Sequence, residues 1–209
     1  MELRLDVHDR VDHLPGQHYV VRLTAEDGYS ATRSYSLASA PSDPLLELFV
    51  EELDEGEVSP YLAGAVEVGD ELEVRGPIGG WFVWDGGSSA VGIGGGTGVV
   101  PLVAMLRHAR DRQVLDRLRL AVSARTLAEL PYADELLAAG AVVALSREAA
   151  GNGRAAGRLT AAELAPLVVE DATFFVCGSA AFATGASDLL MAVGVPASSV
   201  RVERFGPSG

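Results

Sequence analysis

The apolar pattern of the sequence changes abruptly near residues 84–89, and this change constrains the fold more than any other feature. Before it, turn residues separate short segments of alternating or apolar character, at 19–24, 45–52 and 71–74. After it, apolar strand candidates alternate with helical ones. We expect strands at 90–94, 117–123, 142–145 and 173–177, interleaved with helices at 101–112, 132–139, 160–168 and 181–193.

Two domains follow from this change. Short strands broken by turns predict a small antiparallel β-barrel or sandwich in residues 1–86. Alternating strands and helices predict an α/β doubly wound parallel sheet, with helices on both faces, in residues 87–209. A chain of 209 residues that is 48% hydrophobic can bury the two cores that this organisation needs.

The charge distribution differs between the same two halves. The formal net charge is −13, and all 16 basic residues are arginine. Residues 1–86 hold 18 acidic residues and 5 arginines, whereas residues 87–209 hold 11 of each. This excess of negative charge disfavours nucleic acid and anionic membrane surfaces as partners.

Cysteine and histidine usage excludes several kinds of site. One cysteine, Cys177, cannot form an internal disulfide or a four-cysteine cluster, and the four histidines show no metal-ligand spacing with it. We therefore expect no metal, so any electron carrier bound by the chain should be organic. The sequence has no signal-peptide pattern and no stretch of roughly 18 apolar residues that would span a membrane. The expected location is the cytoplasm.

A glycine-rich loop lies between the apolar strand at 90–94 and the helix that follows. Gly95, Gly96, Thr97 and Gly98 leave nearly bare backbone at the beginning of that helix, and Pro101 fits its first turn. Such a loop favours a pyrophosphate, because unpaired N–H groups point outward at a helix N-terminus. It lacks the third glycine of G-x-G-x-x-G, and a purely structural turn is the alternative interpretation.

The segment Arg33-Ser34-Tyr35-Ser36 combines three kinds of ligand-binding group in the first half. On an extended strand Arg33 and Tyr35 share one face, while Ser36 points to the other. The strand could offer a cation for phosphate, a ring for an aromatic ligand and a hydroxyl donor. Alone, the segment is also compatible with packing and a solvated surface charge.

Several short motifs occur in the order found in the ferredoxin–NADP reductase superfamily, which the chain resembles over almost its whole length. They are R-x-Y-S at 33–36, G-x-x-S at 56–59, G-P-x-G at 76–79, the glycine loop at 94–101 and C-G at 177–178. The resemblance implies a six-stranded barrel that binds FAD and an α/β domain that binds NAD(P)H. The chain begins close to the expected second barrel strand, so we expect the usual first strand to be missing, and barrel closure stays open.

The resemblance also implies roles for individual residues. Arg33 would bind the FAD pyrophosphate, Tyr35 would lie against the isoalloxazine, and Ser36 would hydrogen-bond near flavin N5, with Ser34 between them. The Ser59 hydroxyl and the backbone of Gly56 and Val58 would wrap the phosphates. Phe205, near the end of the chain, is a candidate to cover the flavin, with plain packing as the alternative.

On the nicotinamide side, the resemblance places Cys177 and Gly178 beside the reacting ring. Cys177 would shape this pocket and would not act as a nucleophile, although a small buried hydrophobic side chain is the alternative. Glu203 is a candidate for proton handling, with a solvated glutamate as the alternative. Ser36, Cys177 and Glu203 are thus the expected catalytic residues.

The expected dinucleotide is NADP rather than NAD. A 2′-phosphate calls for arginine and hydroxyl donors, whereas a free ribose diol is usually met by a carboxylate. The segment Leu145-Ser146-Arg147-Glu148 resembles the NADP-selecting V-S-R-E segment of the superfamily. Ser123, Arg125, Arg154 and Arg158 lie after neighbouring strands or just beyond. The lysine and tyrosine that accompany this segment in plant-type members are not evident.

These features favour an FAD-dependent NAD(P)H oxidoreductase that passes electrons to a ferredoxin, an oxygenase component or another redox protein. Two other functions stay open. The chain could be a non-catalytic flavin-containing electron-transfer subunit, although the C-terminal cysteine cluster of related subunits is missing. It could also be a dinucleotide-binding protein without flavin. The acidic first half argues against unaided docking of an acidic ferredoxin there.

Overall fold

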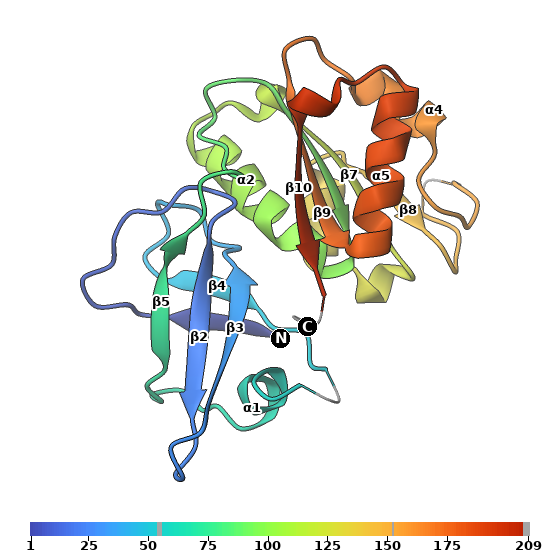
Figure 1. Ribbon diagram of the computed structural model, residues 1–209. Coiled ribbons are helices and arrows are strands. Elements are labelled where there is room, and N and C mark those ends of the chain that lie inside the picture. The colour runs from blue at the N-terminus through green and yellow to red at the C-terminus, as the bar shows by residue number, and fades with distance from the viewer. Residues whose placement is uncertain (54–55, 152, 207–209) are drawn as a thin grey trace.

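The computed structural model describes residues 1–53, 56–151 and 153–206, which form an antiparallel half and a parallel half (Figure 1). The antiparallel strands are β1 (Glu2–Leu5), β2 (His18–Thr24), β3 (Ser30–Ser36), β4 (Leu46–Phe49) and β5 (Glu73–Ile78). Strand β2 lies between β3 and β5 in one sheet, and β1 pairs with β4 in another. A bridge between Leu37 and Leu48 joins the two sheets.

One hydrophobic cluster fills the space between these sheets. Tyr19 and Val21 are buried on one face of β2, as the two-residue period of a strand requires. Leu46 and Leu48 of β4 pack against them, together with Leu62 of the short helix α1 (Ser59–Gly64). The predicted antiparallel, barrel-like domain is therefore confirmed, with its strands divided between two sheets around a single core.

The parallel half is a five-stranded sheet in the order β10-β9-β6-β7-β8. Its strands are β6 (Ala90–Gly95), β7 (Leu118–Ala124), β8 (Val142–Leu145), β9 (Thr173–Ser179) and β10 (Val200–Phe205), and every pair is parallel. From β6 the chain builds outward through β7 and β8, then returns to add β9 and β10 on the other side. The switch in direction lies between β6 and β9.

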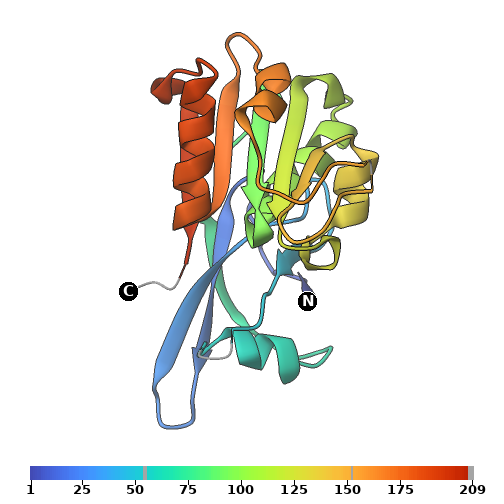
Figure 2. The same ribbon diagram turned by 90° about the vertical axis from the view of Figure 1, so that its right-hand side faces the viewer.

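Helices cover both faces of this sheet, as Figures 1 and 2 show. On one face, α2 (Val100–Asp111) and α3 (Ala133–Ala138) pack with Leu120, Val122 and Phe175. On the other face, α4 (Ala161–Leu164) and α5 (Ala180–Ala192) pack with alternate residues of the same strands, among them Ile93 and Val176. Burial on both faces explains the nearly continuous apolar runs, and the predicted doubly wound sheet is confirmed.

Most elements begin and end within three residues of their predicted positions. The helix expected at 160–168 is shorter, because α4 ends at Leu164 and Pro166, which lacks an N–H donor, lies in a following 3-10 turn. The strand expected at 71–74 lies a few residues later, as β5. Strands β1 and β10 and helix α1 had no predicted counterpart.

Residues 79–89 connect the two halves. Phe82 and Trp84 are buried in the cluster beside α2, and the Phe82 ring centroid lies 5.2 Å from that of Phe175. The connecting segment therefore packs on the parallel half, and the domain boundary at residue 86 stays a prediction. Within the three described ranges, no helix is long and apolar enough to cross a membrane.

Candidate functional site

A groove of about 1150 Å³ is lined by residues of both halves and collects most of the predicted site residues. From the antiparallel half these are Arg33, Ser34, Tyr35, Ser36, Gly56 and Ser59. From the parallel half they are Gly95, Gly96, Thr97, Ser123, Arg125, Ser146, Arg158 and Phe205. The predicted residues that lie outside its lining, all within the described part of the chain, are Val58, Gly98, Pro101, Arg147, Cys177, Gly178 and Glu203.

The groove lies at the carboxyl ends of β6 and β9. These two strands are neighbours, with Gly94 opposite Cys177, and the chain continues from them to opposite sides of the sheet. Gly95 at the end of β6 and Ser179 at the end of β9 both line the groove. Open α/β sheets bind ligands at such a switch point, so the topology places this groove where a dinucleotide would bind.

Strand β3 supplies polar side chains from the other half. It pairs with β2 so that Arg33 lies opposite Val21 and Tyr35 lies opposite Tyr19, which puts Arg33 and Tyr35 on one face. Both side chains are partly exposed and line the groove. Ser36, the next residue, lines it as well although it is only 8% exposed. A cation, a ring and a hydroxyl therefore face one groove from one strand.

The loop before α1 requires glycine at position 56. A Cβ atom at Gly56 would lie 2.6 Å from the Ser59 Oγ and 3.0 Å from the Leu53 carbonyl oxygen. The Ser59 Oγ accepts a hydrogen bond of 3.2 Å from the Leu53 N–H, which fixes the hydroxyl at the groove. Val58 is fully buried in the antiparallel core. Val58 thus anchors the loop, whereas Gly56 and Ser59 face the groove.

Arg33 forms an ion pair with Glu57 of this loop. Its Nη2 donates to the Glu57 Oε2 at 3.2 Å, and the Tyr29 hydroxyl donates to the Glu57 Oε1 at 2.6 Å. The Arg33 and Glu57 side chains are 41% and 46% exposed. Exposed pairs of this kind contribute roughly 0–1 kcal/mol, so a phosphate could displace Glu57 by forming bidentate bonds to the guanidinium.

The loop after β6 passes too close to β9 for side chains. A Cβ atom at Gly98 would lie 2.3 Å from the Cys177 carbonyl oxygen, and one at Gly95 would lie 2.6 Å from the Phe182 ring. Gly96 has a φ of 56°, in the left-handed region that favours glycine. The chain then enters α2, with Pro101 buried in its first turn. Bare backbone therefore lines the groove at the beginning of a helix, which favours an anionic ligand.

Comparison with known proteins agrees with this arrangement. Residues 1–83 match the oxidoreductase FAD-binding domain family. The FAD/NAD-binding domain of nitric oxide dioxygenase from Vibrio cholerae O1 biovar El Tor has the same fold at a TM-score of 0.79 and 25% identity, covering 94% of this chain and 87% of that one. The chain belongs to the ferredoxin–NADP reductase superfamily.

Two further proteins are similar to the chain. The reductase component of propane 2-monooxygenase from Mycolicibacterium smegmatis is 32% identical over 163 residues, which is 74% of this chain and 45% of that protein. The chain thus spans less than half the length of this relative. A ferredoxin NADP+ reductase from Neisseria gonorrhoeae, with bound FAD and NADP, shares the fold at a TM-score of 0.77 and 20% identity, covering 97% and 91% of the two chains.

The antiparallel half is the FAD-binding domain of this superfamily member, and its residues fit the cofactor. Arg33 offers a cation, and Ser59 offers a hydroxyl that the loop holds at the groove. Gly56 leaves space that a Cβ atom would fill beside that hydroxyl. Tyr35 and the nearly buried Ser36 are neighbours in the sequence of β3, and both line the groove, which offers a ring and a hydroxyl to an aromatic ring system.

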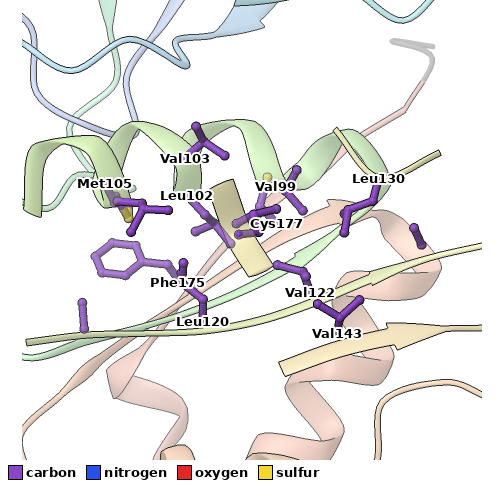
Figure 3. Packing of buried hydrophobic residues seen from close by; sticks show 14 of the residues in the cluster. Val99, Leu102, Val103, Met105, Leu120, Val122, Leu130, Val143, Phe175 and Cys177 are labelled. Carbon is purple, nitrogen blue, oxygen red and sulfur yellow. The ribbon is translucent and has the colours of Figure 1, made fainter. Parts of the chain in front are cut away.

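Cys177 lies in the core rather than in the groove. Its side chain is fully buried with Val99 and Leu102 in the cluster that includes α2 (Figure 3). Burial raises the pKa of its thiol well above the ordinary value, so the group is a neutral thiol. Its carbonyl oxygen lies so close to the loop that a Cβ atom at Gly98 would be 2.3 Å from it. The role of Cys177 in the nicotinamide pocket stays a prediction, and its buried position is compatible with shaping that pocket by packing.

Glu203 lies beside Cys177 on the neighbouring strand. The two residues are register partners in β10 and β9. Burial raises the pKa of the Glu203 carboxyl to about 7. A carboxyl with that pKa can exchange a proton near neutral pH, which is compatible with proton handling. The predicted catalytic role nevertheless stays untested, because Glu203 does not belong to the described groove lining.

Replacing Glu203 with glutamine is expected to make unfolding less dependent on pH. Because burial raises the folded-state pKa, the stability linked to the neutral carboxyl is fully present below about 4.5 and is lost as the pH rises through about 7. The loss should be roughly 1–2 kcal/mol after allowance for solvent screening. Thermal unfolding of parent and E203Q protein at about pH 5 and about pH 8 measures it. If the difference in Tm between parent and E203Q protein is the same at both pH values, the raised pKa of Glu203 is contradicted.

Most of the residues predicted to bind the 2′-phosphate line the groove, and Arg147 lies outside it. Ser123, Arg125, Ser146 and Arg158 line the groove, whereas the exposed Arg147 side chain does not. The Arg125 Nε donates to Glu129 Oε2 at 2.6 Å, one helical turn later in sequence. Arg158 thus lies in the described groove lining and Arg147 outside it, and the phosphate-binding role of each stays a prediction.

Phe182 was not predicted from the sequence. It lies in the first turn of α5, its N–H donates to the Ser179 Oγ at 3.3 Å, and its ring faces Gly95 across the groove lining. The signal that could have found it is an aromatic residue following the C-G pair by four positions, since only glycine at position 95 leaves room for that ring. Residues 49–53 and 128–131 also line the groove without a motif to mark them.

A metal site needs a group of ligand side chains close together. Across residues 1–53, 56–151 and 153–206, no group of three or more His, Cys, Asp or Glu side chains is placed to hold a metal ion. The described groove offers backbone amides, arginines, hydroxyls, aromatic rings and the carboxylates of Glu51, Glu52 and Glu129.

Proposed function

We propose that this chain is an FAD-dependent NAD(P)H oxidoreductase that passes electrons to a separate redox-protein acceptor. One observation carries the proposal: Tyr35 and Ser36 of the FAD-binding domain line the same groove as Gly95–Thr97 of the parallel sheet. Hydride transfer requires the two reacting rings to meet at one place in fixed geometry, and a shared groove meets this requirement.

Each half of the groove has a distinct task in this proposal. Arg33 and Ser59 bind the FAD pyrophosphate, the Tyr35 ring packs against the isoalloxazine, and the Ser36 hydroxyl hydrogen-bonds near N5. When bound, FAD accepts a hydride and releases electrons singly. The loop at 95–98 binds the dinucleotide pyrophosphate, and Phe205 at the end of β10 covers the flavin and excludes water.

The acceptor in this proposal is a ferredoxin or an oxygenase component. Support comes from the similar protein of Mycolicibacterium smegmatis, which is the reductase component of propane 2-monooxygenase. A cytoplasmic location is part of the same proposal, because reduced nicotinamide dinucleotides are supplied there. The strong negative charge of residues 1–86 favours an acceptor whose docking face is not itself acidic.

An absorption spectrum followed by anaerobic titration tests the proposal. The purified protein should be yellow, and NADPH or NADH should bleach the flavin band in the absence of oxygen. A yellow protein whose flavin neither nucleotide reduces would favour the non-catalytic electron-transfer subunit. A colourless protein that binds nucleotide and takes up no added FAD would favour a flavin-free dinucleotide-binding protein.

We further propose that NADP is the preferred dinucleotide. Ser123, Ser146 and Arg158 line one end of the groove and together provide two hydroxyl donors and a cation. A dianionic 2′-phosphate gains more from such a set than a free hydroxyl does. Arg125 shares this region, although its ion pair with Glu129 offsets part of its charge.

Replacing Arg158 with alanine is therefore expected to weaken NADPH by roughly 1.5–3 kcal/mol, about ten- to a hundredfold, and to leave NADH nearly unaffected. R147A is the matched control, because it removes the same charge from the same segment between β8 and α4 without touching the described groove lining. Reductase activity with each nucleotide and an artificial acceptor measures the ratio. A preference for NADH in the parent, or an unchanged ratio in R158A, would refute this assignment.

A further inference from the structure

One arginine of α2 joins the antiparallel half to the parallel half, outside the described groove lining. The Arg107 Nη1 donates to the Glu47 Oε1 at 2.8 Å and to the Ala38 carbonyl oxygen at 3.1 Å, both in the FAD-binding domain. Its Nη2 and Nε donate to the two Glu135 carboxylate oxygens of α3 at 2.6 and 3.2 Å. A single guanidinium thus connects the antiparallel half with two helices of the parallel half.

This contact is shielded from solvent. The Glu47 side chain is 6% exposed and that of Arg107 is 18% exposed. The second Glu47 oxygen accepts from the Arg4 Nε at 3.1 Å, and the Arg107 guanidinium carbon lies 5.0 Å from the Tyr132 ring centroid. Although burial alone would lower the pKa of Arg107, hydrogen bonds to Glu135 and Glu47 raise it. Buried, charge-assisted contacts of this kind hold their partners in narrow geometry.

In the FAD-binding domain, Arg107 donates a hydrogen bond to the backbone two residues after Ser36, at the Ala38 carbonyl oxygen. The Ala38 N–H donates to the Glu47 carbonyl oxygen at 2.8 Å, and the Glu47 N–H donates to the Ser39 Oγ at 3.1 Å. These bonds make residues 37–39 and β4 one unit. The Glu47 carboxylate therefore belongs to a strand whose backbone is hydrogen-bonded to the segment that follows Ser36.

In the parallel half, Arg107 lies about two helical turns after Val100, where α2 emerges from the glycine loop. A helix is stiff over this length. The loop at 95–98 and the Arg107 side chain consequently move together, and the same guanidinium fixes the Ser36 segment on its other side. Arg201, by contrast, donates to the carbonyl oxygens of Trp81 and Val83 in the connecting segment. These bonds involve neither the loop at 95–98 nor the segment that follows Ser36.

We propose that Arg107 is a positioning residue that sets how closely the dinucleotide half of the groove approaches the FAD half. This inference rests on the proposed hydride transfer. Displacement of reacting groups by about 1 Å can slow such a step by about a hundredfold, so a contact outside the groove controls the rate without touching either ligand. Lysine cannot replace the arginine fully, because one ammonium group lacks the planar fork that reaches the Glu47 and Glu135 carboxylates together.

The test compares R107M and R107K with R110M. Arg110 lies on the same helix and bonds only to Glu135 among the contacts described for it, so R110M removes an ion pair without cutting the link to the FAD-binding domain. R107M should keep bound FAD and a near-parental dissociation constant for NADPH, while the limiting rate of flavin reduction falls about ten- to a hundredfold. The limiting rate of flavin reduction in R107K should lie between those of R107M and the parent, and the rate in R110M should stay within about twofold of the parental rate.

A second measurement separates positioning from general damage. Hydrogen exchange of the backbone at residues 36–39 should become faster in R107M than in R110M, because Arg107 holds the Ala38–Glu47 unit. E47Q should slow flavin reduction as R107M does, and the double variant should be no slower than the worse single variant. If R107M folds poorly, E47Q and R107K carry the same test.

Failure of the positioning role can be distinguished from failure of the proposed function. A folded, FAD-loaded R107M that reduces its flavin within about twofold of the parental limiting rate would overturn the positioning role. Additive losses in the R107M/E47Q pair would overturn it as well. If the parent itself is not reduced by NADPH or NADH, the proposed function fails first, and unchanged exchange at residues 36–39 in R107M would then separately refute the mechanical link.

Discussion

Replacing Arg33 with alanine is expected to release FAD from the protein on dilution. The substitution removes a charge-assisted contact to phosphate that contributes roughly 1.5–3 kcal/mol, which corresponds to about a ten- to hundredfold loss of affinity. The competing ion pair with Glu57 is exposed on both sides and offsets little of this effect. Flavin fluorescence during serial dilution measures the dissociation constant.

Arg22→Ala is the matched control for this experiment. Arg22 lies on the neighbouring strand β2 and forms an exposed ion pair with Glu73 at 3.4 Å, outside the described groove lining. Its loss should leave FAD affinity within about twofold of the parent, since exposed pairs contribute little. Equal FAD affinity of R33A and the parent would show that the phosphate contact has been assigned to the wrong residue.

Replacing Gly98 with alanine is expected to disrupt the dinucleotide half of the groove. The new Cβ atom would lie 2.3 Å from the Cys177 carbonyl oxygen, and neither that backbone atom nor the loop can rotate away as a side chain could. Overpacking of this kind costs roughly 1–3 kcal/mol of stability. We expect a lower Tm and at least about a tenfold weaker binding of NADPH, while FAD, bound through the other half, stays in place.

Gly185→Ala provides the opposite control. Gly185 lies within α5, and a Cβ atom there would meet nothing within 4 Å. Alanine is favoured over glycine inside a helix by roughly 0.5–1 kcal/mol, so G185A should keep nucleotide binding and raise Tm slightly. A G98A protein as stable and as tight in NADPH binding as the parent would contradict the close approach of the loop to β9.

The sequence predicted those parts of the site that lie in short contiguous motifs. Arg33, Tyr35 and Ser36 were singled out by a motif that resembles one of the superfamily, and Gly95–Thr97 by glycine between a strand and a helix; all of them line the groove, and their roles stay predictions. The division into antiparallel and parallel halves was readable from the spacing of apolar residues. That inference depends only on the fixed periods of strands and helices.

Features that depend on contacts between distant segments could not be predicted. Arg107 and Glu47 are 60 residues apart, and neither charge stands out among the other acidic and arginine residues. The ring of Phe182 lies over Gly95 only because β6 and β9 are neighbours in the sheet. Arg147, which the motif pointed to, lies outside the described lining, whereas Arg158 reaches the groove from a loop with no regular pattern.

The order of strands along the chain has a consequence for synthesis on the ribosome. Every antiparallel strand lies within residues 2–78, so the FAD-binding domain has all its strand partners before any of the parallel sheet has been made. Strand β6, by contrast, waits for one of its two partners, because β9 is not synthesised until residues 173–179. During that interval β6, β7 and β8 present an open strand edge to solvent, the kind of surface that nascent-chain chaperones shield from aggregation.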